Sequence, residues 1–539
     1  MFGLTRFRAY RTELSGRCSR LRRLRFAWAL TILLAILAAS LASHESWIFG
    51  GTIQLPRLGE LAQLLPSAQL IGESVALEDL TLDSREVRPG SLFCATRGTR
   101  FDGHSFIDDA VASGAAAVMV AHPVSVQIPQ LVVPSVRHAI GRVASYFFGD
   151  PSRSLEVIGI TGTNGKTTTS YLVESVLNRS DRNVGLIGTI ESRFAGLNRP
   201  SIYTTPEAPD LHRLLADMLR DGTQSVVMEV SSHGIDQHRI DSMRFEIAVF
   251  TNLSPEHLDY HGTMEQYYYT KARLFVPELS NAAVIGTDTE WGRRLASQVS
   301  IDHVTYGPDP ENDFVVSDIE LVPEGTRFQL RHGRHTTRLT VPILGAHNAY
   351  NAAAAVAVGH LLGLDATEIY AGIENCHSVA GRFESIVLGQ EFRVVVDYAH
   401  TPDAIRSLIE TVRLQSPGGR VILVAGARGR RDRLKRPELG RAAAMSDLAI
   451  LTADNPGDEE PAEIVAQLLA GTLDVATPPM VVELDRRRAI TLAINEAGRG
   501  DTVLIVGRGH EQSLRVGSEV VYLDDREVAR SAVAARIGI

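Results

Sequence analysis

A glycine-rich turn at residues 159–169 separates a predicted strand at 155–160 from a predicted helix that runs from about 168 to 178. The turn reads Gly-Ile-Thr-Gly-Thr-Asn-Gly-Lys-Thr-Thr-Thr. Glycines let backbone N–H groups approach phosphate oxygens, and the N-terminus of the following helix adds a favourable dipole. Lys166 would then reach the β- and γ-phosphates of a nucleotide, with the Thr167 hydroxyl on Mg²⁺. The spacing is not the strict Walker pattern, because five residues instead of four separate Gly159 from Gly165. The turn predicts an α/β fold built around a parallel sheet.

The whole chain alternates short apolar strands with helical stretches, and its 539 residues are too many for one ordinary domain. We expect a basic and apolar extension at 1–52 and a small α/β domain at 53–152. A central domain with a parallel, doubly wound sheet follows at 153–380, and its strands include VGLIG and SVVMEV. The alternation restarts at Gly381 with strands such as RVVVDYA and RVILVAG, which predicts a Rossmann-like C-terminal domain at 381–539.

Lysine is nearly absent from this chain. Of the 54 lysine and arginine residues, only Lys166, Lys271 and Lys435 are lysines. Arginine has replaced lysine almost everywhere that a generic positive charge suffices. The three remaining lysines are candidates for chemistry that requires an amine able to lose its proton or to form a covalent adduct.

The composition excludes several classes of protein. A net charge of −9 argues against a nucleic-acid binder that works by bulk positive charge. The three cysteines, Cys18, Cys94 and Cys376, lie far apart and form neither a disulfide framework nor a zinc cluster. They suit a reducing compartment.

The N-terminal segment combines eight arginines in residues 1–25 with an uncharged apolar run at 26–42. Such a run has the character of a signal peptide or membrane anchor. We expect the remainder of the chain, with its phosphate-binding turn, to use ATP in the cytoplasm. We therefore favour a start codon placed too far upstream, and a membrane-tethered form stays open.

A second group of polar residues follows two further predicted strands. Glu229, in MEVSSH, ends a buried strand, and His257 lies in the segment TNLSPEHLDYH after the next strand. Carboxylates at the carboxyl edge of such a sheet face the ligand crevice. Mg²⁺ prefers oxygen ligands, so Glu229 is a candidate ligand and His257 a less usual one.

The motifs TGTNGKTT, MEVSSH and HLDYHG, with Lys271 in YYYTKARLF, resemble the Mur ligases that build the peptidoglycan precursor of the cell wall. The resemblance runs from about residue 53 to the end and is greatest to the MurE type, UDP-N-acetylmuramoyl-L-alanyl-D-glutamate–2,6-diaminopimelate ligase. It implies a three-domain architecture with a P-loop-type central sheet. It also implies a UDP-substrate domain at 53–152, a central ATP-binding domain and a C-terminal amino-acid-binding domain.

The resemblance assigns roles residue by residue. Lys271 would carry a CO₂-derived carbamate and share Mg²⁺ with Thr167, Glu229 and His257, so that Lys166, Glu229, His257 and Lys271 form the catalytic set. The expected ATP-binding residues are Gly162, Thr163, Asn164, Gly165, Lys166, Thr167, Thr168, His347, Asn348, Arg382 and Asp397. The expected UDP-substrate contacts are Ser84, Thr204, Thr205, Ser231, Gln237 and Arg239. The expected amino-acid contacts are Arg431, Asp454, Asn455, Pro456, Gly457, Gly507 and Glu511.

The amino-acid pocket departs from the family pattern. Enzymes that add meso-diaminopimelate carry DNPR, whose arginine holds the distal carboxylate, but residues 454–457 read DNPG. The family's GGDRD reads RGRRD at 428–432, so Arg430 is one possible replacement for the missing charge. The acids Asp458, Glu459 and Glu460 follow directly and would suit L-lysine. We favour meso-diaminopimelate, and L-lysine remains the alternative.

The implied reaction is ATP-dependent amide formation through an acyl phosphate on the side-chain carboxylate of D-glutamate. Its partners are ATP, the UDP-N-acetylmuramoyl-dipeptide and a diamino acid, without nucleic acid, and we expect a cytoplasmic monomer. Folylpolyglutamate synthase, of the same superfamily, uses a similar phosphate loop and lysine, but the uridine-end motif DSREVRPGSLF argues against that function. A catalytically silent P-loop scaffold is the alternative from another class.

Overall fold

The computed structural model describes residues 55–98, 101–180, 182–376, 379–429, 433–473 and 479–539, and these form three α/β parts. The first part has a five-stranded sheet in the order β1-β5-β4-β3-β2, in which only the β1–β5 pair is antiparallel. Its strands are β1 (Gln69–Ile71), β2 (Asp79–Thr81), β3 (Ser91–Cys94), β4 (Ala117–Val120) and β5 (Gln130–Val132). Its helices are α2 (Leu58–Leu64), α3 (Ile107–Ala112) and α4 (Val136–Phe147).

The middle part contains an eleven-stranded sheet in the order β16-β15-β14-β13-β12-β11-β6-β10-β7-β8-β9. The strands from β14 to β7 in this order pair in parallel, as the sequence predicts. Both edges are antiparallel, which the sequence analysis did not foresee. The strands are β6 (Glu156–Thr161), β7 (Val184–Ile187), β8 (Glu191–Phe194), β9 (Leu197–Pro200), β10 (Ser225–Glu229), β11 (Phe245–Phe250), β12 (Ser280–Gly286), β13 (Asp302–Gly307), β14 (Phe314–Val322), β15 (Gly325–His332) and β16 (His335–Val341).

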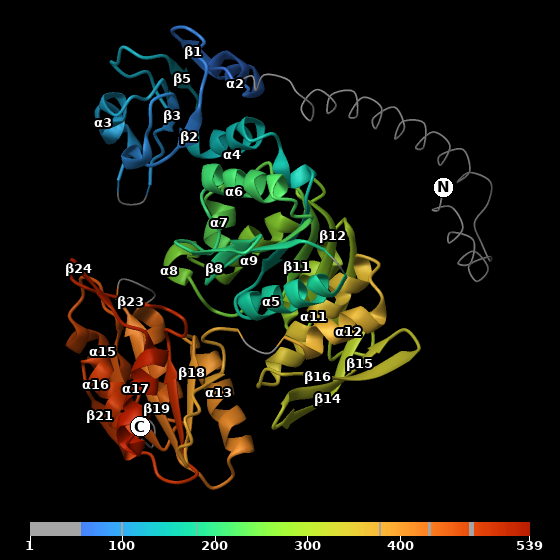
Figure 1. Ribbon diagram of the computed structural model, residues 1–539, viewed down its shortest axis with the longest axis vertical. Coiled ribbons are helices and arrows are strands. Elements are labelled where there is room, and N and C mark those ends of the chain that lie inside the picture. The colour runs from blue at the N-terminus through green and yellow to red at the C-terminus, as the bar shows by residue number, and fades with distance from the viewer. Residues whose placement is uncertain (1–54, 99–100, 181, 377–378, 430–432, 474–478) are drawn as a thin grey trace. The chain divides into compact units, whose positions relative to one another are not determined.

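Helices cover both faces of this middle sheet, because its central strands are apolar on both sides. Every residue of β10 is buried. On one face, α5, α11 and α12 pack together beside the sheet (Figure 1). On the other face lie α6, α7, α9 and α10. The helices are α5 (Lys166–Leu177), α6 (Ala208–Arg220), α7 (Ser232–Asp236), α8 (Leu258–His261), α9 (Met264–Ala272), α10 (Glu290–Gln298), α11 (His347–Leu361) and α12 (Ala366–Glu374).

The C-terminal part has a six-stranded sheet in the order β17-β18-β22-β19-β20-β21, parallel except for β17. Helices α16 and α17 pack on one face, and α13, α14 and α15 pack on the other. The strands are β17 (Glu384–Ser385), β18 (Arg393–Asp397), β19 (Val421–Arg428), β20 (Leu448–Asn455), β21 (Met480–Val482) and β22 (Thr502–Val506), with the separate hairpin β23 (Ser513–Val516) and β24 (Glu519–Tyr522). The helices are α13 (Pro402–Gln415), α14 (Arg436–Ala443), α15 (Pro461–Ala470), α16 (Arg486–Glu496) and α17 (Asp525–Ile537).

One local prediction needs adjustment. Helix α5 begins at Lys166, two residues before the predicted start, because Gly165 with φ +86° completes the turn. The segment between α4 and β6 contains a 3₁₀ helix (Pro151–Arg153) with Pro151 and Ser152 buried.

No helix among the described residues is long and apolar enough to cross a lipid bilayer. The apolar run at 26–42 lies outside the described residues.

Candidate active site

The glycine-rich loop connects β6 to α5, and its two inner glycines adopt backbone conformations that L side chains rarely take. Gly162 has φ +148° and Gly165 has φ +86°. A Cβ atom at Gly162 would lie 1.9 Å from Oγ1 of Thr251, and one at Gly165 would lie 2.4 Å from Oδ1 of Asn351. Both positions therefore require glycine, and the loop stays open for phosphate oxygens at the N-terminus of α5.

Two of the three lysines share one backbone acceptor in this loop. The Nζ atoms of Lys166 and Lys271 each donate to the Gly162 carbonyl oxygen at 2.9 Å. Lys271, on α9, is only 1% exposed, and burial together with the Lys166 charge holds the pKa of its amine well below the ordinary value. Burial also lowers the pKa of Lys166. The structure thus provides a buried lysine that favours the neutral amine.

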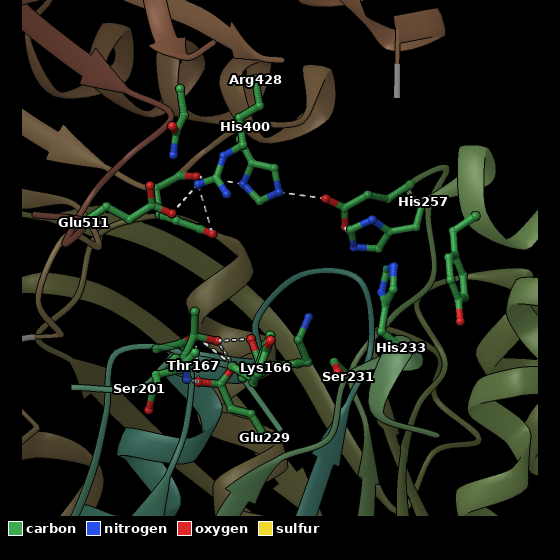
Figure 2. A pocket seen from close by; sticks show the side chains of 18 of the residues that line it. Lys166, Thr167, Ser201, Glu229, Ser231, His233, His257, His400, Arg428 and Glu511 are labelled. Atoms are coloured by element: carbon green, nitrogen blue, oxygen red, sulfur yellow. Dashed lines mark hydrogen bonds and ion pairs between the residues drawn. The ribbon is translucent and has the colours of Figure 1, made fainter. Parts of the chain in front are cut away.

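Glu229 ends β10 beside the start of α5, and its carboxylate is surrounded by hydroxyl groups (Figure 2). Thr167 Oγ1 lies 3.0 Å from both carboxylate oxygens. Thr189 donates to Glu229 through its backbone N–H at 2.8 Å and its hydroxyl at 2.9 Å. The carboxylate and the Thr167 hydroxyl form an oxygen pair of the kind that Mg²⁺ accepts alongside water and phosphate oxygens.

His257 immediately precedes α8, with φ +57°. Burial lowers the pKa of its imidazole to about 3, so the ring is neutral near pH 7 and able to act as a ligand. No hydrogen bond or ion pair links Glu229 or Thr167 to His257 or Lys271 in the part of the chain that the structure describes. Among all the residues that the structure describes, no group of three or more histidine, cysteine, aspartate or glutamate side chains could hold a metal ion. The expected four-residue metal set is therefore in contact only through its Glu229–Thr167 half.

Four of the expected UDP-substrate residues form one hydrogen-bonded group with Thr205 at its centre. The Thr205 hydroxyl lies 2.9 Å from the backbone nitrogen of Ser231, and its carbonyl accepts from Arg239 at 2.8 Å. Arg239 also donates to the Gln237 side chain at 2.7 Å. Thr204 lies beside the group, and its hydroxyl is 3.1 Å from that of Thr189.

Ser84 lies elsewhere, at the start of a 3₁₀ helix (Ser84–Glu86) of the first part. It lines neither of the two cavities described next.

A cavity of about 220 Å³ contains expected ATP contacts from both sides of residue 380. Arg382 donates to Thr167 Oγ1 at 3.1 Å. Asp397 accepts from the amides of Phe383 and Ala399, each at 2.7 Å, so it shapes the loop that carries Arg382. The expected residues in the lining are Asn164, Gly165, Thr168, His347, Asn348, Arg382 and Asp397. The sequence analysis did not single out the lining residues Asp288, Tyr306, Tyr350 and Asp403.

A second cavity of about 1600 Å³ brings together expected residues of the catalytic, UDP-substrate and amino-acid sets. Its lining includes Lys166, Thr167, Glu229, Ser231, Gln237, Arg239, His257, Asp454, Asn455 and Glu511. It also includes Glu256, His400, Arg428 and Lys435, which the sequence analysis did not assign. Glu256 accepts from His400 at 2.7 Å. Burial by itself would raise the pKa of this carboxyl, but its interactions with His400 hold the pKa well below its usual value.

Only some of the expected amino-acid contacts line the larger cavity. Asp454 is 1% exposed and lines the larger cavity, with its Oδ1 atom lacking a hydrogen-bond partner. Pro456, Gly457 and Gly507 do not line the cavity. Gly457 pairs instead with the β23–β24 hairpin, donating to the Arg515 carbonyl at 3.0 Å. Arg431 and Arg430 lie outside the described residues.

Three family models match this chain. They are the Mur ligase family catalytic domain at residues 77–148, the Mur ligase middle domain at 160–359 and the Mur ligase glutamate ligase domain at 381–509. The chain is also 43% identical over 489 residues to a protein of Gloeobacter violaceus, covering 89% of this chain and 97% of that one. The chain belongs to the Mur ligase family. It is an ATP-dependent amide ligase, and the catalytically silent scaffold is set aside.

Further members of the Mur ligase family support this assignment. A protein of Geobacillus thermodenitrificans is 41% identical over 471 residues, covering 86% of this chain and 95% of that one. Both relatives are named UDP-N-acetylmuramoyl-L-alanyl-D-glutamate–2,6-diaminopimelate ligase. A solved structure of the same name superposes with a TM-score of 0.62 at 29% identity, covering 90% of this chain and 99% of that one. Folylpolyglutamate synthase of Mycobacterium tuberculosis, at 19% identity and a TM-score of 0.59, shares the fold.

Within this Mur ligase, the unassigned cavity residues had little signal in the sequence. His400 lies in DYAHTPD and Glu256 in SPEH, motifs that drew attention through their neighbours. Lys435 is the third lysine of the chain, and its rarity was the available clue. Arg428 stands where the family's GGDRD has its first glycine, and the sequence analysis did not use this departure.

Proposed function

We propose that this Mur ligase joins 2,6-diaminopimelate, in its meso form, to UDP-N-acetylmuramoyl-L-alanyl-D-glutamate with hydrolysis of ATP. The observation that carries the proposal is the large cavity. It contains the phosphate loop, the Glu229–Thr167 pair and an ion pair between Arg428 and Glu511. The names of the relatives at 41% and 43% identity agree with this substrate.

The residues support amide formation through an acyl phosphate. The loop amides and Lys166 hold the β- and γ-phosphates of ATP while the γ-phosphoryl group passes to the side-chain carboxylate of D-glutamate. The amine of the incoming amino acid then attacks the acyl carbon, and inorganic phosphate leaves. Arg382, which contacts Thr167, adds positive charge beside the transferring group.

Thr167 and Glu229 are the residues that would hold Mg²⁺, and we propose His257 and Lys271 as further members of the same set. A bound ion would neutralise charge on the transferring phosphoryl group. These two residues fit Mg²⁺ because they supply oxygen ligands: the buried carboxylate of Glu229 is in direct contact with the hydroxyl of Thr167.

Lys271 is the residue we propose to carry a carbamate. A neutral lysine amine adds CO₂ to give an N-carboxylate and releases one proton. Its burial and its proximity to the Lys166 charge favour that neutral amine. Arginine is a poor substitute, because its guanidinium keeps its proton at neutral pH.

The acids after Gly457 do not favour L-lysine. Glu459 accepts from the buried Arg436 at 2.9 Å and pairs with Arg433 at 3.2 Å. None of Asp458, Glu459 and Glu460 lines the larger cavity. These three acids therefore give no support to L-lysine as the third amino acid.

We also place the reaction in the cytoplasm, where ATP is available, and expect a monomer. A membrane-tethered form through 26–42 and the division into domains at 53–152, 153–380 and 381–539 stay predictions.

The test is phosphate release from ATP with UDP-N-acetylmuramoyl-L-alanyl-D-glutamate and each of meso-diaminopimelate, L-lysine and L-ornithine. We expect turnover with meso-diaminopimelate, and mass spectrometry should show the tripeptide product. Turnover with L-lysine in preference would overturn the substrate assignment. Absence of amino-acid-dependent turnover with all three would overturn the proposed reaction.

A further inference from the structure

Arg428 stands where two strands of the C-terminal sheet meet the amino-acid site. It is the last residue of β19, and the sheet register pairs it with Asn455 at the end of β20. Asn455 lies two residues before Gly457, the position where the resembling motif DNPR has its arginine. This chain therefore has a guanidinium on the strand beside the position that lacks one.

The surroundings of Arg428 are those of a ligand-binding group. Its guanidinium pairs with Glu511 inside the larger cavity (Figure 2). It lies 5.7 Å from the ring centre of Tyr398, and about three quarters of the side chain is buried. Its Nε atom is buried without a hydrogen-bond partner, as is Oδ1 of Asp454. A cation and a carboxylate that each have unused hydrogen-bonding capacity thus line the same cavity.

We propose that Arg428 is a specificity-determining residue that binds the distal carboxylate of the third amino acid and replaces the arginine absent at Gly457. The inference rests on the proposed function. The distal end of a diamino dicarboxylic acid is a zwitterion, and the Arg428–Glu511 pair presents the opposite charges. The guanidinium receives the carboxylate and Glu511 receives the ammonium, each exchanging an internal partner for a ligand group.

This arrangement discriminates against amino acids without a second carboxylate. The side chains of L-lysine and L-ornithine end in an ammonium alone. Binding either one would engage Glu511 and leave the charge of Arg428, whose side chain is about three quarters buried, without its counterion. Sites built around a buried polar group reject analogues that lack its partner by large factors.

Gly457 has no side chain and takes no part in this role. Its φ of +59° lies in the left-handed region that favours glycine, but no atom lies within 4 Å of the position its Cβ would take, so a side chain placed there has room. Its amide and carbonyl pair with Arg515 and Gly517 of the β23–β24 turn, and the residue lines neither cavity.

The test is Arg428→Met in the full chain, assayed by phosphate release with all three substrates varied. We expect KM for meso-diaminopimelate to rise by about 10- to 100-fold, the usual loss for a hydrogen-bonded charge pair. KM for ATP and for the UDP-dipeptide should change by less than about threefold. The preference for meso-diaminopimelate over L-lysine should fall by a similar factor to the rise in KM. Arg428→Lys should recover part of the affinity for meso-diaminopimelate and part of the preference for it over L-lysine.

Arg515→Met is the matched control. Arg515 is exposed and adjoins Gly457, but it reaches Asn455 through its backbone amide and not through its side chain. We expect wild-type kinetics from this variant. Loss of diaminopimelate affinity in Arg515→Met instead of Arg428→Met would overturn the assignment to Arg428.

A swap variant separates a binding role from a structural one. Arg428→Gly with Gly457→Arg should regain at least part of the affinity lost in Arg428→Gly alone. Equal increases in all three KM values for Arg428→Met, or no change in any, would refute the inference while wild-type turnover with meso-diaminopimelate leaves the proposed function intact. Failure of the wild type to use that amino acid would instead refute the function itself.

Discussion

Replacing Lys271 by alanine tests the chemistry at the phosphate loop. Lys166 and Lys271 both donate to the Gly162 carbonyl, so their Nζ atoms lie within about 6 Å of one another. A carbamate at Lys271 places a negative charge beside the Lys166 ammonium. At that separation and an effective dielectric constant of about 20, one pair of unit charges is worth about 3 kcal/mol. That corresponds to roughly a hundredfold in rate. We therefore expect kcat/KM of Lys271→Ala to fall by at least about 100-fold.

Three companion measurements identify the reason for the loss. Short carboxylic acids such as acetate should restore part of the activity of Lys271→Ala by supplying the missing carboxylate. Lys271→Arg keeps a donor for Gly162 but does not form the carbamate, and it should remain inactive. Lys271→Glu should be partly active and independent of CO₂, whereas the wild type should lose activity in CO₂-depleted buffer.

The reasoning is refuted if Lys271→Arg retains full activity, or if Lys271→Ala falls by less than about threefold. Absence of both acid rescue and CO₂ dependence would limit Lys271 to a structural role. Incorporation of ¹³C-bicarbonate, read as a carbamate resonance, is the direct observation.

Two further changes test the loop and the middle core. Gly162→Ala should raise KM for ATP at least about tenfold, because the new Cβ displaces Thr251, whose hydroxyl holds the Asn164 carbonyl at 2.6 Å. Gly363 also has a positive φ, +71°, but open space around it, so Gly363→Ala should leave that KM unchanged. Burial lowers the pKa of His212 on α6 from 6.5 to about 4. Between these two pH values the His212 imidazole is therefore protonated in the unfolded chain and neutral in the folded chain. Stability of the middle part should fall by about 3 kcal/mol between pH 6.5 and pH 4, and His212→Leu should flatten this dependence.

The KM for ATP of the glycine variants is measured by phosphate-release kinetics. The pH dependence of stability is measured by hydrogen exchange of the α6 amides across the pH range. Identical ATP kinetics in the two glycine variants would remove the steric argument. A wild-type pH dependence that survives in His212→Leu would assign the acid sensitivity to other groups.

Several features of the site follow from local sequence. The glycines at 162 and 165 need positive φ, and a strand before them with a helix after them is readable from hydrophobic periodicity. The scarcity of lysine identified Lys166 and Lys271 without any structure. The antiparallel edges of the middle sheet were missed, because β8, β9 and β14 to β16 mix polar and apolar residues and include exposed positions.

Residue identity over a short window thus determined the phosphate loop, the α/β class and the resemblance to Mur ligases. Tertiary structure alone decided which distant side chains meet. Lys271 reaches the carbonyl of Gly162 from 109 residues away, and Arg428 reaches Glu511 across 83 residues. These contacts depend on the order of strands in a sheet, and that order is set by the packing of helices on both faces. The same packing brings Arg428 beside Asn455, so a guanidinium missing from one strand end is present on its neighbour.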